Sequence, residues 1–127
     1  NGTNSLIYSA NNGHLEIVKF LVERGVEINS TYVVPYNAKI NIYALSDSAT
    51  NGHFKIVKYL VDNGAVISGT NALLNSARNG HFKIVKYLVE KGAEINGTGA
   101  LSNSAINGHF EIVKFLVENG AEINGIN

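Results

Sequence analysis

The chain has 127 residues, with ten Lys and Arg balanced by ten Asp and Glu, so its formal net charge is zero. No overall field therefore favours nucleic acid or an acidic membrane surface as a partner. Apolar residues make up 45% of the sequence, enough for a core, and the absence of cysteine excludes disulfides and thiol chemistry. The start lacks the basic and apolar regions of a signal peptide, and no apolar run is long enough to cross a bilayer. We therefore expect an intracellular, cytoplasmic protein with no membrane partner.

One motif occurs four times along the chain, beginning at Asn12, Asn51, Asn79 and Asn107, so successive copies are 39, 28 and 28 residues apart. A fixed period of this length is typical of a repeat array, in which each unit buries its apolar face against the next unit. The spacing predicts a single domain over residues 1–127. Its parts are repeats at about 2–29, 41–68, 69–96 and 97–124, and an insertion at 30–40.

In the first unit the motif predicts a short helix that neighbours cover on most sides. Its polar residues Glu16, Lys19 and Glu23 are spaced i, i+3, i+7 and form one narrow stripe. The rest of the circumference is apolar: Leu15, Ile17, Val18, Phe20, Leu21 and Val22. A helix this short is marginal in water by itself, so packing between adjacent units must hold it.

The first junction carries the insertion. Two β-prone runs, at 31–34 and 39–43, flank a turn candidate at 35–38, which predicts an enlarged hairpin or a long loop. Two interpretations stay open, because a loop on a rigid scaffold often carries function but an inert insertion is also tolerated. Exposed aromatic and apolar side chains are costly unless something covers them, which makes this segment a candidate binding patch. Its residues are Tyr32, Val33, Val34 and Tyr36.

The third unit shows the local signals most clearly. Residues 70–78 place apolar side chains at helical spacing, and Asn71 is a candidate N-cap. Gly80 then breaks the pattern, as expected of a helix end with a left-handed residue. A second apolar stretch runs over 82–89 and stops at Gly92. Each unit is therefore predicted to be a helix, a tight turn and a helix.

The pattern Asn-Gly-His-x-x-Ile-Val-Lys-x-Leu-Val-x-x-Gly-Ala-x-Ile-Asn, complete at 79–96 and 107–124, resembles the second half of the ankyrin repeat. The resemblance implies an all-α solenoid of four helix-turn-helix units. Of the family's Thr-Pro-Leu-His opening only the Leu survives, and the period is 28 residues rather than the family's usual about 33. The missing residues fall where the family places its β-hairpin finger. We therefore expect fingers that are reduced or absent, with plain turns such as 96–99 in their place.

Metal, nucleic-acid and catalytic chemistry find little support. One histidine recurs per unit, and equivalent atoms of stacked units are ~10 Å apart, whereas a zinc–nitrogen bond is ~2 Å. These histidines are His14, His53, His81 and His109, and we interpret them as structural residues at a helix start. Each recurring lysine has an acidic residue four positions later, which indicates a solvated face and no nucleic-acid partner. No catalytic motif or phosphate loop occurs, so we expect no catalytic residues, no metal, no cofactor and no enzyme activity.

Positions that differ between the units mark the candidate partner-binding surface, since packing leaves them free to vary. They form two sets at i, i+3 spacing on the first helices: Tyr8, Asp47, Asn75 and Asn103, and then Asn11, Thr50, Arg78 and Ile106. The resemblance implies that first helices line a concave surface that binds partner proteins. We therefore expect an interaction scaffold that binds another protein through this face and the inter-repeat loops. The alternatives are drift at exposed sites and a structural or self-associating spacer without a specific client.

The outermost units keep the internal apolar pattern, although terminal repeats normally become polar on their outer face. In the last unit this pattern includes Ile112, Phe115 and Leu116. We therefore expect either flanking repeats in a longer array or end-to-end association with a second copy.

Overall fold

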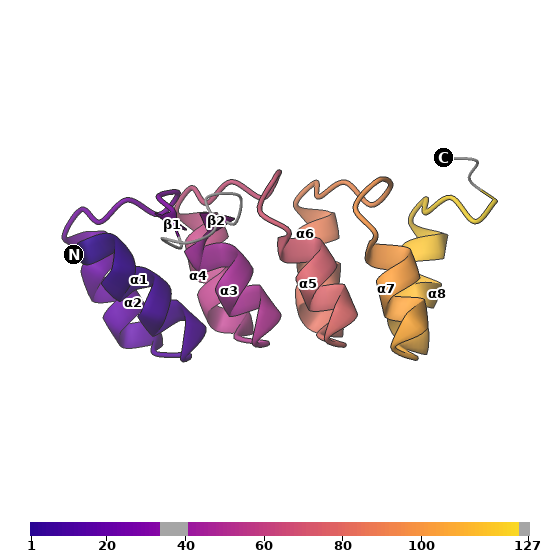
Figure 1. Ribbon diagram of the computed structural model, residues 1–127, viewed down its shortest axis with the longest axis horizontal. Coiled ribbons are helices and arrows are strands. Elements are labelled where there is room, and N and C mark those ends of the chain that lie inside the picture. The colour runs from indigo at the N-terminus through magenta and orange to yellow at the C-terminus, as the bar shows by residue number, and fades with distance from the viewer. Residues whose placement is uncertain (34–40, 125–127) are drawn as a thin grey trace.

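The computed structural model describes residues 1–33 and 41–124, which form an elongated row of four helical pairs (Figure 1). The first helices of the pairs are α1 (Gly2–Asn11), α3 (Ala44–Thr50), α5 (Ala72–Arg78) and α7 (Ala100–Ile106). The second helices are α2 (Leu15–Glu23), α4 (Phe54–Asp62), α6 (Phe82–Glu90) and α8 (Phe110–Glu118). The all-α solenoid of four helix-turn-helix units is confirmed.

A left-handed glycine joins the two helices of each pair. In the second unit Gly52 has φ 79°, and the His53 N–H then donates to the Ser48 carbonyl at 2.9 Å, which fixes the direction of the next helix. Asn71 is the N-cap residue of α5, as predicted, but it makes no side-chain cap. Its backbone is left-handed, with φ 62°. The Thr70 hydroxyl accepts from the Ala72 N–H instead, at 3.4 Å.

The first helices pack against one another in the order α1, α3, α5, α7, and the second helices in the order α2, α4, α6, α8. Packing is more extensive along the row of first helices, because small buried residues let the backbones approach closely. These residues are Ala10, Ala49, Ala77, Ser48, Ser76 and Ser104. The buried serines stay satisfied by bonding within their own helix, as Ser48 does to the Ala44 carbonyl at 2.8 Å.

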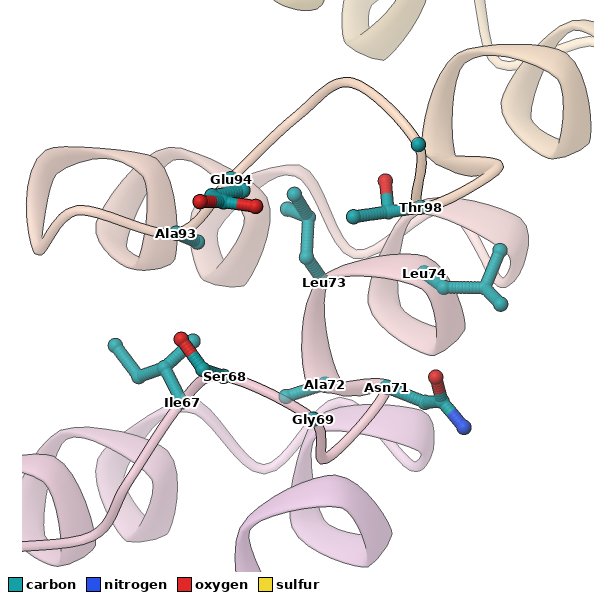
Figure 2. A pocket seen from close by; sticks show the side chains of 11 residues that line it. Ile67, Ser68, Gly69, Asn71, Ala72, Leu73, Leu74, Ala93, Glu94 and Thr98 are labelled. Carbon is teal, nitrogen blue, oxygen red and sulfur yellow. The ribbon is translucent and has the colours of Figure 1, made fainter. Parts of the chain in front are cut away.

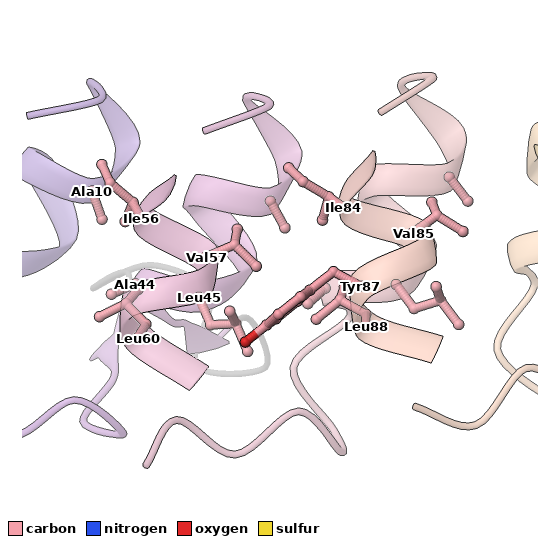
Figure 3. Close-up of a cluster of buried hydrophobic side chains, with 14 of the residues drawn as sticks. Ala10, Ala44, Leu45, Ile56, Val57, Leu60, Ile84, Val85, Tyr87 and Leu88 are labelled. Carbon is pink, nitrogen blue, oxygen red and sulfur yellow. The ribbon is translucent and has the colours of Figure 1, made fainter. Parts of the chain in front are cut away.

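The hydrophobic core runs between the two layers of helices and continues from unit to unit (Figure 3). The shared Ile-Val and Leu positions of the second helices form its centre. In the two middle units all of them are at most 2% exposed: Ile56, Val57, Leu60, Ile84, Val85 and Leu88. The core is thus shared across every junction, as the short helices require.

The junctions differ in length as the sequence predicts. Between the first two units, β1 (Tyr32–Val33) pairs antiparallel with β2 (Asn41–Ile42), and Tyr32 lies opposite Ile42. This confirms the enlarged hairpin, although its connecting segment falls outside the described residues. The other two junctions are turns with no strand in the described part of the chain, so their fingers are reduced.

Candidate functional site

The candidate site is the outward side of the first helices, which we call the first-helix face. Each helix contributes two residues at i, i+3 spacing, which places both on one side of the helix. They are Tyr8 and Asn11 on α1, Asp47 and Thr50 on α3, Asn75 and Arg78 on α5, and Asn103 and Ile106 on α7. Because the first helices lie side by side, the pairs form a ladder along the row (Figure 1). The structure therefore brings these eight predicted residues onto one surface.

The ends of this ladder are apolar and exposed. Tyr8 is 52% exposed and Ile106 is 79% exposed, although both are large hydrophobic side chains. Arg78 is also exposed, and its Nε donates to the Asn103 Oδ1 at 3.4 Å. A guanidinium has five N–H donors, so this long bond orients Arg78 and leaves most of its donors available. Tyrosine and arginine are among the residue types enriched at binding hot spots.

Three ladder residues on α1 and α3, namely Asn11, Asp47 and Thr50, are more enclosed than Tyr8, Arg78 and Ile106. Asp47 is half-buried, and burial raises the pKa of its carboxyl above the ordinary value. Asn11 accepts a hydrogen bond from Asn51 Nδ2 in the next unit at 2.7 Å, and the Thr50 hydroxyl donates to the Ser46 carbonyl at 2.7 Å. Asp47 and Arg78 lie in adjacent units and carry opposite charges. The face therefore presents an aromatic group, an acid, a base and an aliphatic group in sequence along its length.

Of the insertion at 30–40, the structure describes only residues 30–33. Tyr32 lies in β1, where its backbone pairs with Ile42. Val34 and Tyr36 lie outside the described residues, so their role in a binding patch stays a prediction.

The recurring histidines join neighbouring units, a role that the sequence only partly indicated. His53 Nε2 lies 3.0 Å from the Asn11 carbonyl oxygen, and His81 and His109 make the same contact to Thr50 and Arg78 at 3.0 and 2.9 Å. Since a carbonyl only accepts, each Nε2 carries the proton and donates. Their rings also lie against the turn glycine of the preceding unit. The described residues contain no group of three His, Asp or Glu that could hold a metal ion.

A second link between units was missed by the sequence reasoning. The side chain of Asn29 donates to the Gly64 carbonyl at 3.0 Å and accepts from the Val66 N–H at 2.8 Å. Asn96 bridges the Gly120 carbonyl and the Glu122 N–H in the same way, at 3.2 and 2.9 Å. We call this two-bond bridge the carboxamide clamp. The recurrence of Ile-Asn at the ends of units was the signal that could have indicated it.

A pocket of about 240 Å³ lies between the loop that joins the second and third units and the loop that joins the third and fourth (Figure 2). Residues 67–74 form one wall with the start of α5, and residues 93–98 form the other. The pocket lies at the end of the helices where the inter-repeat loops run. Its lining includes the first residues of α5, which directly precede the ladder residue Asn75.

Comparison with protein families gives matches over the whole chain. The model described as "Ankyrin repeats (3 copies)" matches residues 31–99 and 45–127, and the model described as "Ankyrin repeat" matches residues 1–32. Comparison with curated proteins gives no match. None of the helices in the described residues has the length and apolar character needed to span a bilayer.

Proposed function

Because the chain belongs to the ankyrin repeat family, whose members generally bind other proteins and are typically not enzymes, we propose that it is a scaffold that binds a partner protein through the first-helix face. The observation that carries this proposal is the ladder of unlike side chains on an otherwise uniform stack. The opposite charges of Asp47 and Arg78, which lie between two exposed hydrophobic ends, make the two directions along the ladder different. We also propose an intracellular, cytoplasmic location, which cell fractionation would test.

The order of the ladder defines the chemistry of a suitable partner. A segment laid along the row meets Tyr8, then Asp47, then Arg78 and finally Ile106. Equivalent positions are ~10 Å apart in stacked helices, and an extended chain covers roughly 3.3–3.6 Å per residue. The partner therefore offers an apolar group, a cation, an anion and a second apolar group, at about every third residue. The opposite charges favour one direction of binding over its reverse.

A capture experiment with matched variants tests this proposal. The immobilised protein is offered a lysate, and the bound clients are compared between the wild type, Tyr8→Ala, Arg78→Ala and Lys58→Ala. Lys58 is an exposed residue of α4 outside the ladder and serves as the control. A client that Lys58→Ala retains and both ladder variants lose supports the proposal. Clients that all four proteins capture equally would contradict it.

The outer faces of the described row favour a second candidate function, association with a second copy end to end. Ile17 of α2 is 50% exposed, whereas its counterparts Ile56, Ile84 and Ile112 are at most 2% exposed. At the opposite end Phe110 is 69% exposed, and its counterpart Phe82 packs edge-on against the next unit's Phe115 at 5.5 Å between ring centroids. Each outer face thus presents one half of a joint that the interior units make.

Two variants with opposite ends blocked test this second candidate. Ile17→Glu blocks one outer face and Phe110→Glu blocks the other, and both side chains are exposed, so neither change disturbs the core. Sedimentation is expected to show the wild type growing with concentration, each variant alone as a monomer, and an equal mixture as a dimer. A monomeric wild type at high concentration would exclude this function.

A further inference from the structure

The carboxamide clamp is present at two of the three junctions, and the remaining junction has a different residue in the place of the asparagine. Asn29 and Asn96 close the first and third junctions. At the second junction the equivalent residue is Ser68, which is exposed. Serine has one polar atom on a shorter side chain, whereas asparagine offers a donor and an acceptor together. No hydrogen bond in the described part of the chain links Ser68 to the third unit.

The backbone at this junction is otherwise the same as at the next one. Gly69 and Gly97 have φ 78° and 81°, and the residues two positions later, Asn71 and Gly99, have φ 62° and 79°. The hydroxyls of the intervening threonines donate to the carbonyls of Ile67 and Ile95 at the same distance of 2.6 Å. The turn therefore keeps its shape without the asparagine, and the difference between the junctions is confined to the side chain.

The groups that a clamp would bind at the second junction are the Gly92 carbonyl and the Glu94 N–H. Neither takes part in a hydrogen bond with another described residue, whereas their counterparts in the second and fourth units do. The pocket of about 240 Å³ adjoins this position, and Ser68 and Glu94 are among its lining residues (Figure 2). Ile67, Leu73 and Ala93 give it apolar surface, and Gly92 directly precedes Ala93 in the chain.

We propose that this pocket binds a primary carboxamide, the side chain of an Asn or Gln of the partner protein, in the place that Asn29 and Asn96 occupy at the other junctions. The proposal rests on the proposed function, since the pocket adjoins the first-helix face. A primary amide presents an N–H and a C=O on the same edge and satisfies both groups at once. A main-chain peptide is trans, with N–H and C=O on opposite edges, so it satisfies one of the two.

The same geometry disfavours a carboxylate. An ionised carboxylate only accepts hydrogen bonds, so it cannot donate to the Gly92 carbonyl. The Glu94 carboxylate on the pocket wall also repels it. The apolar wall meanwhile accommodates the aliphatic part of an amide side chain. The pocket is therefore expected to distinguish Asn and Gln from the similarly shaped Asp and Glu.

The test uses isobutyramide as the probe and the backbone N–H signals of the isotope-labelled full chain as the readout. Isobutyramide is expected to shift the Glu94 N–H signal saturably, and both N-methylisobutyramide and isobutyrate are expected to leave it within the noise. In Ser68→Asn the built-in amide occupies the site, so the shift is expected to disappear. In Asn96→Ser a second site opens, so a new saturable shift is expected at the Glu122 N–H.

Three results would overturn the proposal: no saturable shift in the wild type, equal shifts with the N-methyl amide, or an unchanged response in Ser68→Asn. Arg78→Ala separates this proposal from the proposed function, because it removes a ladder contact and leaves the pocket intact. If the probe binds but no client depends on Arg78, the pocket stands and the scaffold function fails. If clients depend on Arg78 but no probe binds, the scaffold function stands and the pocket assignment fails.

Discussion

The second helices and the first-helix face of this protein differ in how far their residues recur from unit to unit and in how deeply they are buried. Along the second helices the same Ile-Val and Leu recur in every unit and are buried in the middle units, because each one meets two neighbours. On the first-helix face the residues change from unit to unit, and most of them remain partly or largely exposed. The first set fixes how units stack, and packing leaves the second set free to vary. The difference separates residues that hold the stack together from residues that do not, and substitutions can test each part.

The largest expected effect is at the shared core. Leu60→Ala removes a fully buried side chain from a central unit and leaves a cavity between two layers, so we expect a loss of about 2–5 kcal/mol. Urea denaturation would measure the free energy of unfolding. Ile123→Ala is the control, because Ile123 is 69% exposed and such surface changes usually stay within about 0.5 kcal/mol. Similar losses for both variants would contradict a shared core.

A glycine in the turn gives the next largest effect. In Gly52→Ala the new Cβ would lie 2.7 Å from the His81 ring, at a backbone φ of +79°. Gly108→Ala has a similar φ of +74° but open space around it. We expect roughly 1–2 kcal/mol from the left-handed conformation in both and a further ~1–3 kcal/mol of overpacking in Gly52→Ala alone. Thermal denaturation of the two variants measures this gap, and equal losses would contradict the close ring contact.

Removing a histidine is expected to cost less. His81 donates to the Thr50 carbonyl at 3.0 Å and is half-buried between units, so His81→Ala is expected to lose about 1 kcal/mol. His14 stands at the outer face and is exposed, so His14→Ala is expected to change stability by less than about 0.5 kcal/mol. Chemical denaturation of both variants provides the comparison. A large loss in His14→Ala would show that the histidine stabilises its own unit rather than the joint.

Tyr87 provides a pH-dependent test of the buried layer. Burial, followed by the hydrogen bond to Asp62 and the charge of Asp62, raises the pKa of Tyr87 from 10.0 to about 12. The protonated phenol is therefore favoured in the folded state. Its contribution to stability is complete below pH 10 and is lost as pH rises toward about 12. Subtracting the unfolding free energies of Tyr87→Phe from those of the wild type should isolate this loss. A difference that stays constant over this range would contradict the burial of the hydroxyl.

The smallest effect on stability is expected on the first-helix face. Arg78→Ala removes an exposed side chain whose bond to Asn103 is long, at 3.4 Å, so we expect a change within about 0.5 kcal/mol. A melting curve that superimposes on the wild type would confirm that this position is free of packing. A loss comparable to that of Leu60→Ala would place Arg78 with the structural residues instead.

Much of the fold could be predicted from the sequence because the motif occurs four times, so each position can be compared between the four units. The apolar periodicity around Val57 and Val85 marked the core, and the shortened spacing between units indicated turns in place of fingers. The hairpin at Tyr32 followed from two β-prone runs of ordinary residues. These features are local patterns, and local patterns survive in a single sequence.

The links between units were harder to predict because they join residues far apart in the chain. The partner of His53 is the main-chain carbonyl of Asn11. Every residue has such a carbonyl, so the sequence does not show which one a side chain contacts. The clamp at Asn96 likewise binds backbone atoms of the next unit. Asn71 is the N-cap residue that the sequence predicted, but its backbone is left-handed and the neighbouring Thr70 supplies the side-chain hydrogen bond. The eight ladder residues were found from their variability, and their partner-binding role stays a prediction.

The histidine contacts have one consequence for how such a chain can change over time. Each ring donates a hydrogen bond to the main-chain carbonyl of Asn11, Thr50 or Arg78, so this bond does not involve the side chain at that position. Mutation can therefore exchange the side chain at these three positions while the histidine contact between units persists. The exposed surface of the row can change one substitution at a time, without passing through unstable intermediates.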